Sequence, residues 1–177
     1  MKQHKVNYPN LSDSALRSQM IISELAMMLE EQVLPNFEGY VSIHEQATKY
    51  TILYFWEPDC SHCKTETPKF SKDYDDKKLQ DIGVTVIPIY LHRNINEWEK
   101  YTNHLNTWLD FVTEHNMLKW TNVWEPFGYS HYRDKYDISS SPVLYLLDKD
   151  KKIIAKRISY DQAIGIIEDI EKRETDK

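Results

Sequence analysis

The two cysteines of the chain are Cys60 and Cys63, separated by a serine and a histidine. An apolar, β-rich run from Thr51 to Trp56 precedes them and ends at Glu57-Pro58-Asp59, a sequence typical of a turn. The residues after the turn favour a helix, which would place Cys60 at the helix N-terminus. Unpaired backbone N–H groups and the positive end of the helix dipole stabilise a thiolate at such a position. This arrangement predicts a redox-active pair of thiols.

A C-x-x-C motif can also form half of a zinc site, or consist of two inert buried thiols. A four-ligand zinc site needs further partners, but the chain has no second cysteine pair, and none of its seven histidines has H-x3-5-H spacing. His62 points away from both cysteines if the segment is helical. The sequence therefore favours redox chemistry and predicts no obligatory metal, while metal binding and inert thiols remain alternatives.

The length and charge of the chain restrict the classes of protein to which it can belong. A chain of 177 residues fits one domain and buries enough surface to fold without disulfide cross-links. It carries 22 Lys and Arg residues against 28 Asp and Glu residues, which gives a net charge of −6, and it has no basic cluster. These features argue against nucleic acid as a partner.

The apolar segments of the sequence are all short. None approaches the length of about 20 residues that a membrane-spanning helix requires. The first ten residues, MKQHKVNYPN, are polar and lack the apolar core of a secretion signal, so no signal peptide is predicted in this chain. Taken alone, this pattern is typical of a cytoplasmic protein.

Hydrophobic periodicity predicts a series of helices and strands around the cysteine motif. The first predicted helix covers residues 14–34, and we expect its broad apolar face to pack on the rest of the domain, with docking of a second subunit or another domain as the alternative. The elements predicted after the motif strand are a helix over 60–77, a strand over 83–90, a helix over 96–116, a short helix over 131–136, strands over 143–147 and 152–158, and a last helix that begins at a Ser159–Gln162 capping box.

Aromatic residues are concentrated in the connection over residues 119–136. This connection leads toward Ser141-Pro142, so we expect it to lie beside the two cysteines. Its rings could form a surface that faces a substrate, or they could simply cover the sheet, because buried tyrosines and tryptophans do both.

Two separate parts of the sequence carry a resemblance to a known family. The first is the motif and its flanks, with matching residues at Phe55, Trp56, Pro58, Cys60, Cys63, Lys64, Glu66 and Pro68. The second is Ser141-Pro142 before a predicted strand, which matches the family's cis-proline. On these residues the chain resembles the thioredoxin superfamily, and most closely its TlpA/ResA-type thiol-disulfide oxidoreductases.

The resemblance implies an α/β, thioredoxin-like fold, in which a central mixed β-sheet is flanked by helices. It extends in order over residues 50–171. We therefore expect a thioredoxin-like domain over residues 50–177, with a helical insertion at about 95–117 and an N-terminal helical extension over residues 1–49. Members of the family are mostly exported, which implies a location in the bacterial cell envelope.

The chemistry of sulfur assigns different roles to the two cysteines. Cys60, at the exposed helix start, is expected to attack a substrate disulfide as a thiolate, and Cys63, one turn deeper, to resolve the mixed disulfide. Glu66 follows three residues later and could accept or return a proton during resolution, a role that the resemblance supports. The alternative is that Glu66 is a helix glutamate that faces solvent.

Four further residues are predicted to contact the substrate: Trp56, His62, Ser141 and Pro142. A histidine between the cysteines would favour the thiolate and make the pair more oxidising, unless it merely faces water. A cis bond before Pro142, which the resemblance implies, would leave the Ser141 backbone free to pair with an extended substrate and would block a metal from the dithiol.

These assignments define the cofactors and partners that we expect. The redox-active disulfide between Cys60 and Cys63 replaces any separate cofactor. Protein thiols and disulfides are the expected substrates, with an upstream redox partner to restore the pair.

One position departs from the family pattern. Thioredoxin has a buried aspartate in the strand before the motif, and this sequence has Tyr54 there. Proton handling would then fall to Glu66 or to solvent.

Two other functions stay open as alternatives. One is a thioredoxin-like copper-binding protein or metallochaperone, which would use Cys60 and Cys63 with a histidine such as His131. The other is a peroxidase of the peroxiredoxin group, which the stretch EPDCSHC fits less well because it lacks the threonine typical of that group.

Overall fold

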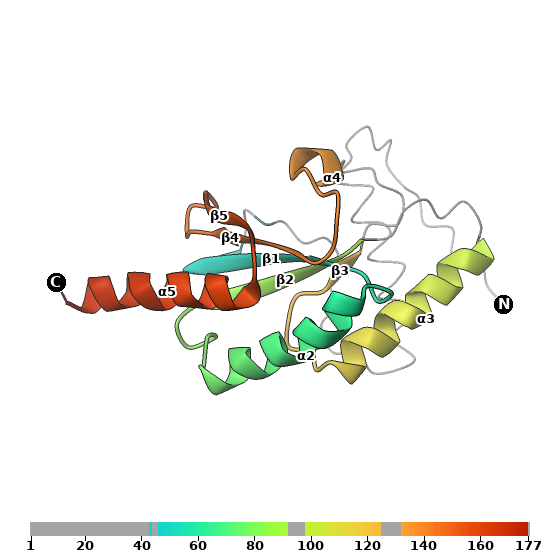
Figure 1. Cartoon of the computed structure of the whole chain (residues 1–177), viewed down its shortest axis with the longest axis horizontal. Helices are drawn as coiled ribbons and strands as arrows, with labels where there is room; N and C mark the ends of the chain where they lie inside the picture. The colour runs from blue at the N-terminus through green and yellow to red at the C-terminus, as the bar shows by residue number, and fades with distance from the viewer. Residues whose placement is uncertain (1–42, 44–45, 92–97, 125–131, 177) are drawn as a thin grey trace, which may run out of the picture.

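The computed structural model describes residues 43, 46–91, 98–124 and 132–176. They form a five-stranded sheet in the order β3-β2-β1-β4-β5, flanked by helices (Figure 1). The elements in chain order are β1 (Tyr50–Trp56), α2 (Ser61–Asp76), β2 (Val84–Tyr90), α3 (Trp98–Glu114), β3 (Val123–Trp124), α4 (Tyr132–Lys135), β4 (Val143–Leu147), β5 (Ile153–Ile158) and α5 (Tyr160–Thr175).

The sheet is mixed, as the sequence predicted. Strand β1 lies at its centre, where it pairs in parallel with β2 and antiparallel with β4. Strand β2 continues in parallel to β3, whereas β4 and β5 form an antiparallel hairpin. Helix α2 connects β1 to its parallel neighbour β2, so the cysteine motif forms the N-terminus of the crossover helix that follows the central strand.

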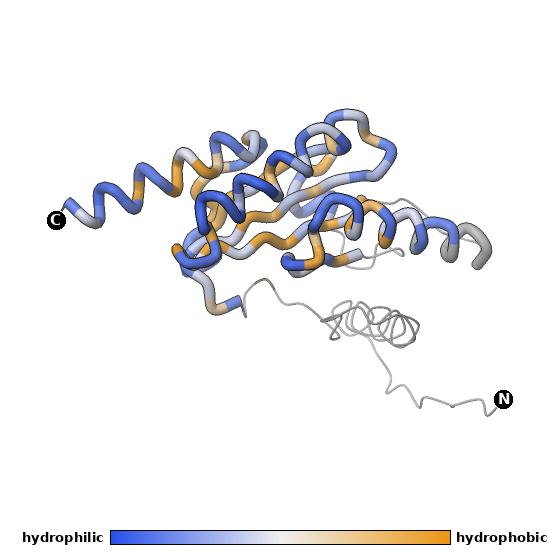
Figure 2. Tube along the Cα trace, turned by 90° about the horizontal axis from the view of Figure 1, so that it is seen from below, coloured by the Kyte–Doolittle hydropathy of each residue, from blue (hydrophilic) through white to orange (hydrophobic). Residues whose placement is uncertain are grey.

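The alternation of side chains along β1 divides the core into two parts. Ile52, Tyr54 and Trp56 join one cluster together with side chains of α2, α3 and α5, whereas Leu53 and Phe55 join a second cluster on the opposite face. Figure 2 shows the hydrophobic residues running through the strands at the centre of the molecule, with many hydrophilic residues along the helices. Every residue of β1 is buried, which fixes its register and the point at which it delivers the chain to the motif.

Several predicted elements agree closely with the structure, and one was missed. The helix predicted over 96–116 is α3. The predicted capping box at the last helix is also present: the Ser159 side chain accepts from the Gln162 backbone N–H, and the Gln162 side chain accepts from the Ser159 backbone N–H. The short strand β3 lies in a stretch that the sequence assigned to a connection. The helix predicted over residues 14–34 lies outside the described residues.

The described rings of the aromatic-rich connection cover the sheet. Trp120 packs against Phe70 and Tyr74 on the α2 side. On the opposite face, Tyr132 stacks on Phe55 with ring centroids 6.1 Å apart. These contacts favour the structural interpretation of the connection over a surface that faces the substrate, for the rings that the structure describes. Residues 125–131 of the connection lie outside them.

Among the described residues, no helix combines the length and the hydrophobicity needed to cross a bilayer.

Candidate active site

Cys60 is the N-cap residue of α2. Its backbone N–H donates to the Glu57 carbonyl at 3.3 Å, which closes the turn after β1. Its sulfur accepts a hydrogen bond from the Cys63 backbone N–H at 3.3 Å and donates one to the Ser141 carbonyl at 3.4 Å. The sulfur therefore occupies the place of a capping side chain, where free N–H groups of the first helical turn are available to a negative charge.

These contacts set the acidity of Cys60. Partial burial raises the pKa of the thiol, but hydrogen bonds from the side chain and backbone of Cys63, from the Ser141 side chain and from the His62 backbone lower it by more. The net result is a pKa below the ordinary value for cysteine. A larger fraction of Cys60 is therefore present as the nucleophilic thiolate near neutral pH.

Cys63 has the opposite environment. Its side chain is fully buried, with 0% exposure, and burial followed by the neighbouring Cys60 sulfur raises its pKa to about 12. Both cysteines are free thiols in this structure. The pair is therefore asymmetric, with one accessible sulfur that ionises easily and one shielded sulfur that does not.

Strand β4 brings Pro142 to the dithiol. Val143 lies opposite Phe55 in the antiparallel β1–β4 pair, so the residues before Val143 meet the end of β1 where the motif begins. The Ser141–Pro142 peptide bond is cis, the geometry that the resemblance implied. This conformation accompanies the contact between the Ser141 carbonyl and the Cys60 thiol, although the two residues are 81 positions apart in the chain.

Glu66 lies one helical turn after Cys63 and is half-buried. It forms an ion pair with Lys69 at 3.0 Å. It also lines a cleft of about 340 Å³, together with Tyr54, Phe70, Pro142, Arg157 and Tyr160. The predicted role of Glu66 in proton transfer stays a prediction, because its described hydrogen-bond partner is Lys69 and not a cysteine.

The remaining predicted site residues, His62 and Trp56, differ in their exposure. His62 is exposed, and the group that it offers to Cys60 is its backbone N–H. Trp56 is fully buried, with its ring stacked on Phe111 at 4.3 Å and on Tyr90 at 5.5 Å. The predicted contact between Trp56 and a substrate is therefore not supported, since its ring belongs to the core.

Tyr54 has a buried partner, Thr67, that was not predicted from the sequence. The hydroxyl groups of Tyr54 and Thr67 lie 2.6 Å apart in the interior, directly below the dithiol helix turn. Thr67 lies four residues after Cys63, so the two share a face of α2, and both are buried. This i, i+4 spacing was the signal in the sequence that could have identified Thr67.

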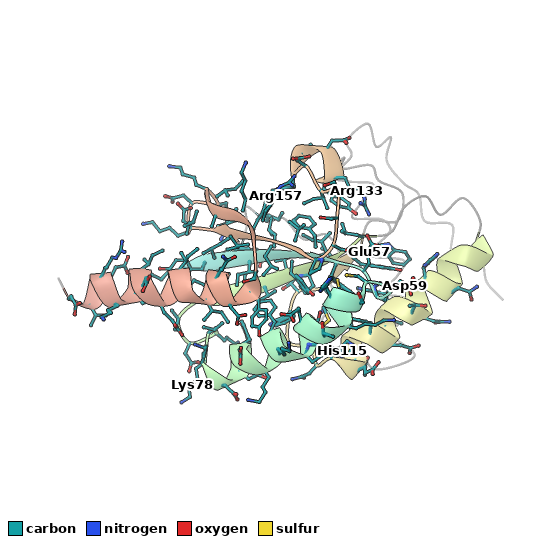
Figure 3. The ribbon with its side chains drawn as sticks, viewed as in Figure 1. Glu57, Asp59, Lys78, His115, Arg133 and Arg157 are labelled. Carbon is teal, nitrogen blue, oxygen red and sulfur yellow. The ribbon has the colours of Figure 1, made fainter. Side chains whose placement is uncertain are left out.

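Charged residues lie on the turn that leads to the dithiol and on later elements of the chain. Figure 3 shows Glu57 and Asp59 at the turn between β1 and α2, whereas Arg133 and Arg157 lie toward α4 and β5. No group of three or more His, Cys, Asp or Glu side chains suited to a metal ion occurs in the described part of the chain. His131, the residue considered as a third copper ligand, lies outside that part.

A central strand that ends at a C-x-x-C helix, facing a cis-proline from the antiparallel half of the sheet, is the architecture of thioredoxin-fold proteins. The asymmetric cysteine pair gives the site the character of a thiol-disulfide oxidoreductase within that class.

Comparison with known proteins agrees with this class. A family model described as thioredoxin-like matches residues 48–153. A domain of a possible thiol-disulfide isomerase from Cytophaga hutchinsonii ATCC 33406 is 33% identical, with a TM-score of 0.62, and the match covers 78% of this chain and 86% of that one. The chain belongs to the thioredoxin-like family.

Two further solved structures are similar to the chain. The thioredoxin domain of a thiol-disulfide oxidoreductase from Bacteroides vulgatus is 25% identical, with a TM-score of 0.58 and coverage of 73% of this chain and 84% of that one. A thiol:disulfide interchange protein from Bacteroides sp. is 26% identical, with a TM-score of 0.54 and coverage of 76% and 79%. No curated protein sequence matches the chain.

Proposed function

We propose that the chain exchanges disulfides with protein substrates through Cys60 and Cys63, as a thiol-disulfide oxidoreductase of the TlpA/ResA type. The observation that carries this proposal is the asymmetry of the two thiols, since the pKa of Cys60 is lowered and that of buried Cys63 is raised to about 12. A nucleophile that ionises easily and a shielded second thiol are the two parts that stepwise disulfide exchange requires.

The reaction proceeds in two steps. The Cys60 thiolate attacks one sulfur of the substrate disulfide, forms a mixed disulfide with it and releases the other substrate sulfur as a thiolate. The Cys63 sulfur then attacks Cys60, which forms the Cys60–Cys63 bond and releases the second substrate sulfur. Two electrons pass from the dithiol to the substrate, and the reverse sequence oxidises a substrate dithiol.

Protein substrates are favoured by the backbone around Ser141. Its carbonyl is directed at the Cys60 sulfur, and the adjacent peptide bond is cis. An extended polypeptide that brought its disulfide to Cys60 would lie along this segment and could form backbone hydrogen bonds with it. His62, exposed next to Cys60, is placed to contact such a substrate.

The remaining assignments follow from the same proposal. The cysteine pair itself carries the electrons, so no separate cofactor is needed, and an upstream redox partner restores the pair after each turnover. The resemblance to TlpA/ResA-type proteins supports a location outside the cytoplasm, in the bacterial cell envelope.

A Cys63→Ser variant tests the proposal. The reduced variant is mixed with a disulfide-bonded protein and examined on non-reducing gels and by mass spectrometry. We expect a mixed disulfide through Cys60 to accumulate, because the sulfur that resolves it is absent, and we expect dithiothreitol to release it. Cys60→Ser is the matched control and should form no adduct.

Absence of the adduct with Cys63→Ser would contradict the proposal. A copper-binding protein would behave differently in the same experiment, because loss of Cys63 would then weaken binding of Cu(I) without trapping any protein.

A further inference from the structure

Two buried hydroxyl groups, those of Tyr54 and Thr67, have no role in the two steps of the proposed reaction, and Thr67 lies one helical turn after Cys63. The Tyr54 and Thr67 oxygens are 2.6 Å apart, and the two side chains are 2% and 0% exposed. Tyr54 comes from the centre of β1, and Thr67 shares the inward face of α2 with Cys63. The hydroxyl pair is thus fixed between the sheet and the helix that carries the dithiol.

Burial creates a requirement at Cys63. Its side chain is fully buried, so water does not solvate the negative charge that develops on the sulfur during resolution. Groups of the protein must replace water as hydrogen-bond donors to this charge. Burial and then the Cys60 sulfur raise the pKa of Cys63, whereas the backbone of Glu57 and the side chain of Tyr54 lower it.

Tyr54 is suited to donate and not to ionise. Burial, and then the charge of a neighbouring Cys63 thiolate, raise the pKa of the Tyr54 hydroxyl far above its usual range. The phenol therefore keeps its proton. Its ring meets the edge of Phe70 at a centroid distance of 5.9 Å, which holds the hydroxyl in place.

Thr67 can set the direction of the Tyr54 proton. Either hydroxyl of the pair can be the donor. If Thr67 donates to the Tyr54 oxygen, the Tyr54 proton is free to point at the Cys63 sulfur, and each hydrogen bond polarises the next. A donor chain of this kind is neutral throughout, unlike the carboxylate that thioredoxin has at the position of Tyr54.

We propose that the Tyr54 hydroxyl, oriented by Thr67, donates a hydrogen bond to the Cys63 sulfur in the step that resolves the mixed disulfide. This inference rests on the proposed function and identifies how its second step is stabilised. In that step the Cys60–Cys63 bond forms, the bond between Cys60 and the substrate sulfur breaks, and its electron pair leaves on the substrate sulfur. The proton of Cys63 passes to that departing sulfur or to solvent. Tyr54 contacts a reacting atom, whereas Thr67 is a positioning residue.

The other titratable groups around Cys63 occupy different places. Cys60 adjoins it at the start of α2. Glu66 on α2, Arg157 on β5 and Tyr160 on α5 line the cleft that Tyr54 also borders. Of these, Glu66 is the one that could compete for the role, because a carboxylate can accept the Cys63 proton.

The test follows the two steps with 5,5′-dithiobis(2-nitrobenzoate), an aromatic disulfide. Attack by Cys60 releases one coloured thiolate, and attack by Cys63 on the resulting mixed disulfide releases the second. The second phase is intramolecular, so its rate does not depend on the reagent concentration. Stopped-flow absorbance over a range of pH therefore reports resolution by itself.

We expect Tyr54→Phe to slow the second phase about three- to tenfold between pH 7 and pH 9, since loss of the donor raises the pKa of Cys63 further and leaves less thiolate to attack. The first phase should change less than about twofold, because Cys60 has other hydrogen-bond partners. The matched control is Tyr50→Phe, which removes a hydroxyl from the same strand face, where it donates to Glu171 at 2.8 Å. Both phases should be unchanged in that variant.

A second pair of variants tests Thr67 independently of Tyr54. Thr67→Val should slow the second phase by a smaller factor, and Thr67→Ser should restore it, because serine returns the hydroxyl. The two Thr67 variants also test the proposed hydrogen bond to Cys63 if Tyr54→Phe does not fold.

The inference is overturned if Tyr54→Phe, or Thr67→Val where Tyr54→Phe does not fold, keeps the wild-type second phase at every pH. It is also overturned if Glu66→Gln slows the second phase while Tyr54→Phe does not. Failure of the proposed function gives a different result, in which the wild-type protein itself shows no second phase.

Discussion

The first turns of α2 and α5 have the same local geometry and serve different ends. In α5, the Ser159 hydroxyl accepts from the Gln162 backbone N–H at 3.2 Å, and in α2 the Cys60 sulfur accepts from the Cys63 backbone N–H at 3.3 Å. Both capping residues have extended backbone conformations, with φ of −77° and −76°. The capping atom thus accepts from the backbone N–H of the third helical residue in both helices, and it is an oxygen in α5 and a sulfur in α2.

The third residue of each helix completes the contrast. The Gln162 side-chain oxygen in turn accepts a hydrogen bond from the Ser159 backbone N–H at 2.9 Å, so both residues of the capping box are paired. No hydrogen bond from the Cys60 backbone N–H to the Cys63 side chain completes a capping box in α2, and the Cys63 thiol is buried in the core. A helix N-terminus therefore provides stability when its donors are fully used, and reactivity when a sulfur that can ionise takes the place of the cap.

The largest expected effect comes from changing the capping sulfur to oxygen. Cys60→Ser should abolish disulfide exchange, with a loss of at least about three orders of magnitude, because a serine hydroxyl is not ionised near neutral pH and cannot form a disulfide. The same change should leave the free energy of unfolding within about 0.5 kcal/mol of wild type, since serine is a preferred capping residue. Exchange rates and urea unfolding measure the two effects.

A marked loss of stability in Cys60→Ser would contradict the comparison, because it would mean that the sulfur does more for the fold than a capping hydroxyl can.

The next effect is a difference in reactivity between the two thiols. Alkylation by iodoacetamide proceeds through the thiolate, so its rate rises as the pH passes the pKa of each cysteine. For Cys60, with its lowered pKa, the rise should occur below the pH of an ordinary thiol, and for Cys63 only near the pKa of about 12. At pH 8 we expect Cys60 to react at least about a hundred times faster than Cys63. Mass spectrometry of peptides after timed alkylation gives both rates.

Equal rates of alkylation at the two cysteines would show that the burial of Cys63 does not protect it, and the division of roles between the thiols would fail.

Some elements of the structure could be predicted from the sequence, and others could not. The capping box at Ser159 was predictable because its signal lies within four residues. Strand β3 was not, because it consists of two residues, Val123 and Trp124, that become a strand only by pairing with Ile89 and Tyr90 of β2. Local patterns carry information on local geometry, and β3 has no local pattern of its own.

Trp56, Glu66 and Thr67 show the same limit of local sequence patterns, because the burial of a side chain depends on elements that are distant in the sequence. Trp56 ends a strand beside the motif, which suggested a substrate contact, but Phe111 of α3 covers its ring. Glu66 and Thr67 follow Cys63 by three and four residues, and both spacings lie on one side of a helix. The two residues differ in their surroundings, since Thr67 is fully buried and Glu66 is partly exposed, and the sequence does not show this difference.

The smallest expected effect comes from removing the structural cap. Ser159→Ala should lower the free energy of unfolding by about 1 kcal/mol, because the Gln162 backbone N–H loses its acceptor. Disulfide exchange should keep its wild-type rate, since α5 carries none of the proposed catalytic groups. Ser159→Asp is the matched control, because aspartate also caps helices and should retain most of the stability. Slower exchange in Ser159→Ala would show that the two helix ends are not independent.

The most direct measurement of the central claim is a redox titration of Cys60 and Cys63. The protein is equilibrated in glutathione buffers of graded ratio, its remaining thiols are alkylated, and the number of free thiols is counted by mass. The account predicts that both thiols disappear together at one midpoint, reversibly and without a lasting glutathione adduct, because they form a two-electron couple. Two thiols that stay reduced across the whole accessible range, or that are lost one at a time as glutathione adducts, would contradict it.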